Sequence, residues 1–246
     1  MWTSSASPAI LSIVISLGSC LSTPVSQAAT DLPITQAKQL SQANETRRNR
    51  QIAPVMSAVH ADWLTRPERD AEEQPDRLIE ALSISEGATV VDLGAGVGYF
   101  TWRLAKQVGS RGRVLAVDIQ QRMIDLLERN LSEKGIHNVE AILASEDNPG
   151  LPVGEVDLVL MVDVYHELQQ PEKTIKHVRQ SLKPDGRLVL VEYRKEDPTI
   201  PIHPLHKMTV EQARFELGLM NFQLTDLLDF LPRQHILIFK DAAQYQ

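Results

Sequence analysis

The sequence predicts an α/β fold with a doubly wound, mostly parallel sheet of seven strands that ends in a C-terminal antiparallel hairpin. From residue 75 onward, continuous β-branched runs alternate with segments of helical spacing, which is the pattern of parallel strands joined by crossover helices. The last two runs are separated only by residues 231–234, whereas a parallel return takes about a dozen residues or more. The first observation predicts a sheet covered by helices on both faces, and the second predicts the hairpin.

Each element follows from its local pattern. Strands are expected at residues 88–93, 113–119, 139–144, 156–164, 187–193, from about 223, and at 235–239. Helices are expected between them at residues 99–107, 121–134, 171–182 and 210–219. The last helix has a clear start, because Thr209 and Gln212 have the spacing of a capping box.

Length and charge limit the organisation and the partners. At 246 residues the chain exceeds one typical domain of roughly 100–200 residues, so one domain with appendages is the simplest interpretation. The net charge of -7 argues against a nucleic-acid partner, since that binding needs clustered Lys and Arg. A small-molecule partner is favoured. Cys20 is the only cysteine, so no intramolecular disulfide and no cysteine-based zinc site can form.

The first thirty residues are typical of an export or anchoring segment. Residues 1–30 contain no Asp, Glu, Lys or Arg, and the apolar run 9–18 has the length of a signal-peptide core. It is short for a bilayer span, which takes about 20 residues. Cleavage after Ala28 and lipidation of Cys20 are competing interpretations, and an uncleaved apolar terminus is a third. We expect export to the periplasm or membrane anchoring; an anchored chain with its domain facing the cytoplasm is the alternative.

Three further segments follow. Residues 31–50 are polar and predict a linker. Residues 51–74 combine apolar bulk with cations and predict a helical cover over the site, and the main domain is expected to span 75–246.

The strongest chemical signal is a glycine loop at residues 94–98. An apolar strand runs into three alternating glycines and then into a helix. Glycine permits a sharp turn with positive φ and lets the backbone approach a ligand closely. The helix that follows presents free N–H groups to an anion. Asp118 ends the next strand, where a carboxylate can bind ribose hydroxyls. The alternative is a tight turn beside a solvated acid.

These residues carry a family resemblance. The segment from Asp92 to Gly98 resembles motif I of class I S-adenosylmethionine-dependent methyltransferases, and its spacing differs from the G-x-G-x-x-G of nicotinamide sites. Residues 114–118, 157–165 and 182–187 fit the same family. The resemblance implies a Rossmann-like methyltransferase fold, S-adenosyl-L-methionine as cofactor, and methyl transfer to a small-molecule acceptor by in-line displacement. A non-catalytic cofactor-binding module is an alternative, and a nicotinamide-dependent oxidoreductase is a weaker one.

The resemblance also implies roles for single residues. In the family the loop glycines line the cofactor, the next strand's acid binds ribose, and the acid after the fourth strand faces the amino-acid part. The corresponding residues are Gly94, Gly96 and Gly98 for the loop, Asp118 for the ribose, Asp163 for the amino-acid part, and Asp92 for orienting the loop. For the adenine amino group, Glu146 and Asp147 are both candidates; either could instead be a solvated turn acid.

The acceptor is expected where the fourth strand ends, since ligands of such sheets bind outside the strands' carboxyl ends. His166 is the predicted proton acceptor, because an imidazole pKa of about 6.5 suits the task at neutral pH. A histidine held by hydrogen bonds is the alternative. Tyr165 is predicted to position the acceptor or to pack on the cofactor.

Two other polar groups are expected to have no such role. His203 and His206 lack partners of metal-binding spacing, so no metal site is predicted. The string 233–235 is expected to lie in the hairpin, away from the glycine loop.

Overall fold

The computed structural model describes residue 45 and residues 49–245. The predicted export segment, with Cys20 and Ala28, and most of the predicted linker lie outside the described residues. Within the described part of the chain, no helix is both long enough and apolar enough to cross a membrane.

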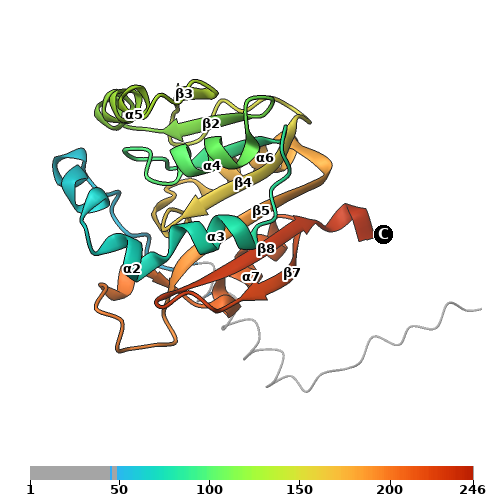
Figure 1. Cartoon of the computed structure of the whole chain (residues 1–246). Coiled ribbons are helices and arrows are strands. Elements are labelled where there is room, and N and C mark those ends of the chain that lie inside the picture. The colour runs from blue at the N-terminus through green and yellow to red at the C-terminus, as the bar shows by residue number, and fades with distance from the viewer. Residues whose placement is uncertain (1–44, 46–48, 246) are drawn as a thin grey trace, which may run out of the picture. The chain divides into compact units, whose positions relative to one another are not determined.

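The described residues form one sheet of eight strands (Figure 1). The strands are β1 Thr89–Leu93, β2 Arg113–Asp118, β3 Val139–Leu143, β4 Val156–Val162, β5 Leu182–Arg194, β6 Lys207–Met208, β7 Phe222–Leu228 and β8 Gln234–Asp241. Their order is β3-β2-β1-β4-β5-β8-β7, and the two-residue β6 pairs with β5. The neighbouring strands β3, β2, β1, β4 and β5 are parallel to one another, whereas β8 is antiparallel to both β5 and β7. This confirms the predicted fold class and hairpin.

Helices connect these strands at nearly the predicted places. The α-helices are α2 Arg69–Glu73, α3 Pro75–Ala81, α4 Thr101–Val108, α5 Gln121–Glu133, α6 Pro171–Ser181 and α7 Val210–Leu219. The 3-10 helices are η1 Ala58–Thr65, η2 Tyr165–Glu167, η3 Pro204–His206 and η4 Ala242–Tyr245. The α7 cap is as predicted, because the Thr209 hydroxyl accepts from the backbone N–H of Gln212 at 3.0 Å. The sequence pattern missed α3 and β6, both short.

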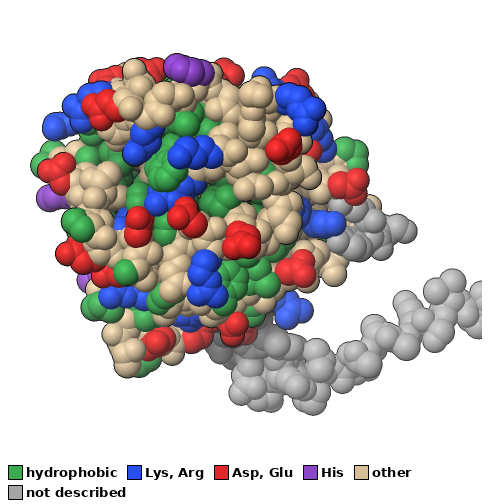
Figure 2. Space-filling view, in the orientation of Figure 1, with side chains coloured by type: hydrophobic (Ala, Val, Ile, Leu, Met, Phe, Trp, Pro, Cys, Tyr) green, Lys and Arg blue, Asp and Glu red, His purple; other side chains and the backbone are tan. Residues whose placement is uncertain are grey.

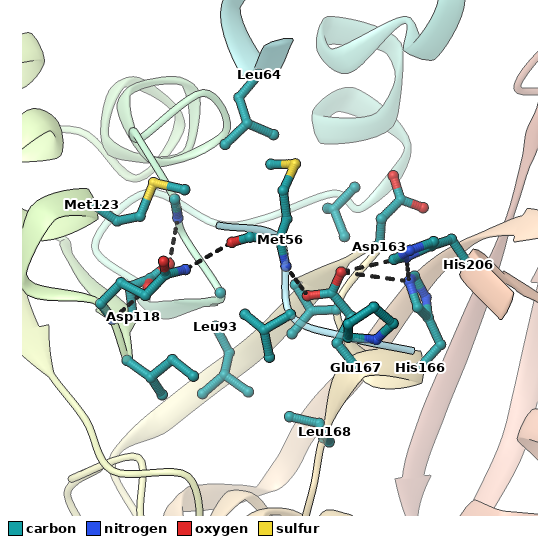
Figure 3. Close-up of a pocket in the computed structure, with 18 of the residues that line it drawn as sticks. Met56, Leu64, Leu93, Asp118, Met123, Asp163, His166, Glu167, Leu168 and His206 are labelled. Atoms are coloured by element: carbon teal, nitrogen blue, oxygen red, sulfur yellow. Dashed lines mark hydrogen bonds and ion pairs between the residues drawn. The ribbon is translucent and has the colours of Figure 1, made fainter. Parts of the chain in front are cut away.

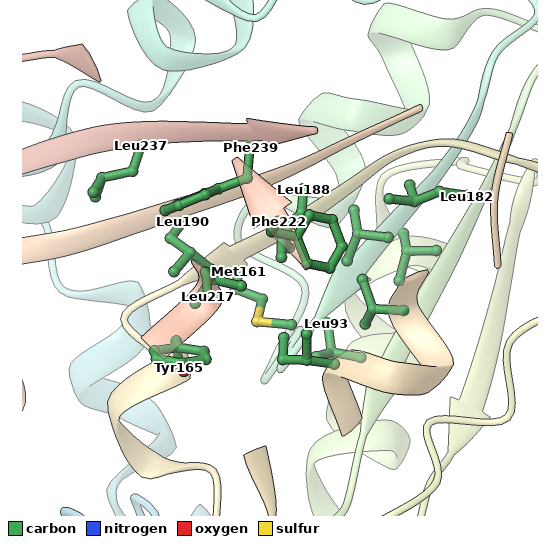
Figure 4. Packing of buried hydrophobic residues seen from close by; sticks show 14 of the residues in the cluster. Leu93, Met161, Tyr165, Leu182, Leu188, Leu190, Leu217, Phe222, Leu237 and Phe239 are labelled. Carbon is green, nitrogen blue, oxygen red and sulfur yellow. The ribbon is translucent and has the colours of Figure 1, made fainter. Parts of the chain in front are cut away.

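The sheet is buried on both faces, as its continuous apolar strands predict. Leu188 and Leu190 of β5 join a cluster with α6 and α7 (Figure 4), whereas Val189 and Val191 face a second cluster with α3 and α4. Successive side chains of a strand point to opposite faces, so one apolar strand supplies both layers. This packing fixes the strand ends from which the site residues emerge.

The N-terminal part of the described chain is tied to the end of β4. The Arg50 guanidinium donates to the carbonyl of His166 at 3.0 Å and forms an ion pair with Glu216 at 2.8 Å. The backbone N–H of Ala53 donates to the same His166 carbonyl at 3.1 Å. These contacts lead residues 53–57 across the carboxyl ends of the strands. On the face seen in Figure 2, acidic and basic side chains are interspersed.

Candidate active site

A cavity of about 620 Å³ lies at the carboxyl ends of β1, β2 and β4. This volume is within the range of roughly 300–1,000 Å³ of small-molecule sites. Figure 3 shows Met56 crossing it, with Asp118 on one side and Glu167 and the histidines on the other. The lining includes Gly94, Gly96, Asp118, Asp163 and His166, so the structure brings most of the predicted site residues together.

The glycine loop has the backbone that the sequence predicts. Gly94 has φ +80°, and a Cβ added there would lie 2.3 Å from a methyl carbon of Val164. The N–H groups of Gly94 and Ala95 both donate to the carbonyl of Val117, which holds the loop against the end of β2. Gly94 and Gly96 line the cavity. Gly98 does not; it packs against Leu127, so its role is in the turn.

Asp118 lies beside this loop. Its Oδ2 accepts from the N–H of Gly96 at 2.9 Å, and its Oδ1 accepts from the N–H of Gln120 at 2.9 Å. The side chain is buried yet lines the cavity. Burial raises the pKa of Asp118, and these two backbone donors oppose the increase. The carboxylate is therefore held in one orientation at the wall of the cavity.

Asp92 lies behind the loop rather than in the cavity. Its Oδ2 accepts from the Thr101 hydroxyl at 2.6 Å, which connects the end of β1 to the first residue of α4. Burial raises the pKa of Asp92 to about 6. This position agrees with a residue that orients the loop, and no direct ligand contact is indicated.

Asp163 and Arg69 both line the cavity, beside the buried Glu73. Asp163 has φ +55°, and its Oδ2 accepts from the Gln234 amide at 2.7 Å. Its Oδ1 is buried and has no hydrogen-bond partner within the described residues. Burial and the nearby Glu73 raise the pKa of Asp163. Arg69 lines the same cavity and pairs with buried Glu73 at 2.9 Å.

The contact with Gln234 corrects one sequence expectation. The string 233–235 does not lie wholly away from the glycine crevice, because Gln234 reaches Asp163. β8 pairs with β5, and β5 pairs with β4, so the end of the hairpin returns toward the end of β4. Loop length predicts that β7 and β8 pair, but it does not predict which earlier strand β8 joins.

A cluster of two histidines and two glutamates closes one end of the site. Nδ1 of His166 lies 2.5 Å from Oε2 of Glu192, and Nε2 of His166 lies 3.1 Å from Nδ1 of His206. Oε1 of Glu167 lies 3.4 Å from that His206 nitrogen and 4.0 Å from Nε2 of His166. Figure 3 shows Glu167, His166 and His206 converging.

Burial and mutual charge set the acidities in this cluster. Burial alone would lower the pKa of His166, but the Glu192 carboxylate offsets this, and the pKa is raised. Burial and the neighbouring His166 lower the pKa of His206. Burial raises the pKa of Glu167 to about 7. The cluster can therefore exchange protons near neutral pH.

Besides Gly98 and Asp92, two more predicted residues, Tyr165 and Asp147, lie outside the cavity lining. Tyr165 is fully buried in the core (Figure 4), and its hydroxyl donates to Glu216 at 2.8 Å, so its placement does not support contact with an acceptor. Asp147 accepts from the Ser145 hydroxyl and pairs with Lys173 at 3.3 Å. Glu146 does line the cavity, which favours it for the adenine end.

Sequence reasoning missed Glu192 and gave no role to Glu167. Glu192 is a fully buried acid in the apolar strand β5, and it binds a histidine 26 residues earlier. A lone glutamate within an apolar run is a usable signal, since buried charges are paired. The sequence does not show its partner, because that depends on the pairing of β4 with β5.

The fold and the cavity together define the class of protein. A doubly wound sheet with a glycine loop and a strand-end acid at one crevice is the arrangement of class I S-adenosylmethionine-dependent methyltransferases. A family model for the methyltransferase domain matches residues 84–229, more than half of the chain. The chain belongs to this methyltransferase domain family. The predicted family is thus confirmed.

Relatives and solved structures agree with this assignment. The chain is 26% identical to the ubiquinone/menaquinone biosynthesis C-methyltransferase UbiE of Shewanella frigidimarina and 30% identical to that of Escherichia fergusonii. Both matches cover 169 residues, 68% of this chain and 60% of the relative. This chain therefore spans about three fifths of the length of these curated relatives.

Two solved structures show the same fold. An S-adenosylmethionine-dependent methyltransferase from Aquifex aeolicus superposes with a TM-score of 0.72 at 24% identity, covering 75% of this chain and 98% of that one. A putative O-methyltransferase from Nostoc punctiforme has a TM-score of 0.63 at 16% identity, covering 84% of this chain and 68% of that one.

Proposed function

We propose that this chain transfers a methyl group from S-adenosylmethionine to a small, largely apolar acceptor. The observation that carries the proposal is one cavity with two different ends. The glycine loop and Asp118 line one side, and the cluster of His166, Glu167 and His206 lines the other. A module that only binds the cofactor would not need the second end.

The cavity walls fit the parts of the cofactor. Gly94 and Gly96 bring the backbone to the wall of the cavity, and Asp118 presents a fixed carboxylate suited to ribose hydroxyls. The unpartnered Oδ1 of Asp163 can accept from the amino group of the cofactor, and the Arg69 guanidinium on the same wall can attract its carboxylate. Glu146 lines the same cavity and can accept from the adenine amino group.

The protein contributes mainly positioning. S-adenosylmethionine supplies an activated sulfonium methyl, and its thioether product leaves without charge. Holding the acceptor in line with this methyl can contribute up to about 7–11 kcal/mol. Proton removal by the histidine and glutamate cluster adds roughly 10²–10⁴ in rate where the acceptor is a weak acid.

The lining indicates the kind of acceptor. Met56, Trp63, Leu64, Leu168 and Ile202 make much of the wall apolar. The curated relatives act in quinone biosynthesis, and an apolar ring carrying an ionisable hydroxyl would suit this wall and the proton-accepting end. We therefore propose an acceptor of this chemical class.

Binding and transfer can be tested separately. Calorimetry should show binding of S-adenosylmethionine and S-adenosylhomocysteine but not of reduced nicotinamide cofactor. Incubation with methyl-labelled cofactor and the organic-soluble fraction of a cell extract should then yield a labelled product. Binding without label transfer to any fraction would favour the non-catalytic module, and binding of only the nicotinamide cofactor would favour the oxidoreductase.

We further propose that residues 1–30 direct the chain to an exported or membrane-anchored location. The support is the uncharged, apolar composition of this segment. Fractionation of native cells, with mass measurement of the mature N-terminus, tests the proposal. An intact Met1 on a chain found only in the cytosolic fraction would contradict it.

A further inference from the structure

The cluster at the second end of the cavity has a property that proton transfer does not require. Three potential ligand atoms face one point: Nε2 of His166, Nδ1 of His206 and Oε1 of Glu167, all within 4.8 Å of one another. They come from η2 and η3, which lie 40 residues apart in the chain. The sequence predicts no metal site, because the spacing of His203 and His206 does not show that His166 and Glu167 lie beside His206 in the fold.

The separations allow all three atoms to bind one ion. Zinc bonds to histidine nitrogen and carboxylate oxygen are about 2.0–2.2 Å long, so two ligand atoms of one tetrahedral ion lie about 3.3–3.6 Å apart, and small side-chain shifts cover deviations of about 0.5 Å. The three separations are 3.1, 3.4 and 4.0 Å. Two histidines and one carboxylate are a ligand set typical of zinc and of other divalent transition metals.

The surroundings fix these atoms in a ligating orientation. Glu192 lies 2.5 Å from Nδ1 of His166, and a carboxylate there holds the proton on Nδ1 and leaves the Nε2 lone pair directed at the cluster. Such carboxylate–histidine pairs are the usual support of metal-binding histidines. Glu167 is held in a similar way, because its Oε2 accepts from the N–H of Met56 at 3.4 Å. Its Oε1 remains directed at the histidines.

The position of His206 is also fixed. The Nζ of the next residue, Lys207, is buried and donates to the carbonyls of Asp197 and Ile200 at 3.1 and 2.7 Å. These bonds hold the segment after β5 in place, and His206 with it.

We propose that His166, Glu167 and His206 bind one divalent transition-metal ion, with its open coordination positions toward the cavity. Metal binding itself does not depend on methyl transfer. Its use rests on the proposed function: an acceptor oxygen on the open position would lose its proton more readily, as metal-bound water does.

The experiment is a zinc titration of the full chain, with affinity tags removed, in competition with a chromophoric chelator near neutral pH. We expect one ion per chain. His206→Ala and Glu167→Gln should each weaken zinc binding by more than about 100-fold, since each removes a ligand. Glu192→Gln should weaken it by about 10- to 100-fold, the usual effect of losing the carboxylate behind a ligating histidine. His60→Ala is the matched control, because His60 lines the same cavity outside the cluster, and its zinc affinity should not change.

Two further measurements separate a loss of zinc binding from a loss of folding. Zinc should raise the midpoint of thermal unfolding of the wild type but not of His206→Ala, because only a folded site binds it. Circular dichroism of the metal-free variants checks that they fold. Because the His206 side chain is partly exposed, we expect His206→Ala to fold normally. Wild-type binding no tighter than that of His206→Ala would overturn the proposal. Calorimetry of S-adenosylmethionine on the metal-free chain tests the methyltransferase function independently.

Discussion

Oδ2 of Asp118 accepts a hydrogen bond from the backbone N–H of Gly96, 22 residues earlier, with 2.9 Å between the two atoms. This bond joins the end of β2 to the glycine loop after β1, so the loop and the acid are held as one unit before any ligand binds. Such preorganisation lowers the cost of binding because fewer groups must be ordered.

Replacing Asp118 by Ala should weaken S-adenosylmethionine binding about 10- to 100-fold, or about 1.4–2.8 kcal/mol, the range of a lost hydrogen bond to a charged group. Isothermal calorimetry measures this directly. Asp118→Asn separates two causes, because its amide oxygen can still accept from Gly96 while the charge is gone. Asp125→Ala, an exposed acid on α5, is the control. Equal affinity in Asp118→Ala and wild type would reject the ribose assignment.

Much of the fold could be predicted from the sequence because its signals are local. The strand, glycine loop and helix around residues 89–108 follow from an apolar run and glycine spacing, and Thr209 marks the start of α7 correctly. The insertion of β8 between β5 and β7 could not be predicted, because strand order depends on contacts distant in the chain.

The candidate site could likewise be predicted only in part. Gly94, Gly96 and Asp118 belong to sequence motifs, and the structure puts them in one cavity. The partner of His166 is Glu192, and no local pattern connects them, since they meet only where β5 lies beside β4. The sequence position of Tyr165 next to His166 predicts a role at the acceptor, but neighbouring residues of a 3-10 turn point in different directions.

Gly94→Ala should destabilise the fold more than Gly154→Ala. Both glycines have similar positive φ, +80° and +70°, so each alanine costs about 1–2 kcal/mol of backbone strain. Only at Gly94 would the added Cβ also meet Val164, at 2.3 Å, which adds about 1–3 kcal/mol of overpacking. Urea unfolding gives both free energies. Adding Val164→Ala to Gly94→Ala should recover part of the loss; no recovery would argue against this clash.

Glu146→Ala should weaken S-adenosylmethionine binding about five- to tenfold, or about 1 kcal/mol for one hydrogen bond. Asp147→Ala should leave it unchanged, because Asp147 is already paired with Ser145 and Lys173 and does not line the cavity. Calorimetry on both variants decides between the two acids. The reverse order of effects would move the adenine contact to Asp147.

Tyr165→Phe should affect stability and spare the reaction. The variant loses the hydrogen bond to Glu216, which corresponds to about 1.5–3 kcal/mol of unfolding free energy for a charged acceptor. The turnover number should change less than about threefold, whereas loss of a proton-transferring group costs roughly 10²–10⁴. Urea unfolding and initial rates with labelled cofactor give the two values. A hundredfold slower reaction in a stably folded variant would restore the direct role for Tyr165.

Asp92→Asn should stabilise the ligand-free protein, and more so as the pH rises. The pKa of Asp92 is about 6 in the folded chain, against about 3.9 for an unfolded aspartate. The folded state therefore binds more protons than the unfolded state between about pH 4 and 6, so the stability contributed by protonated Asp92 is lost through this window. Two pKa units correspond to about 3 kcal/mol, and the loss is complete above about pH 7. Asparagine stays neutral and can still accept from Thr101, so the stability difference between variant and wild type should grow from near pH 4 to pH 7 and then level off.

Urea unfolding at several pH values measures this difference, with Asp125→Asn as the exposed control. A difference that does not vary with pH would show that the buried charge of Asp92 is stabilised in the folded chain as well as it is in water.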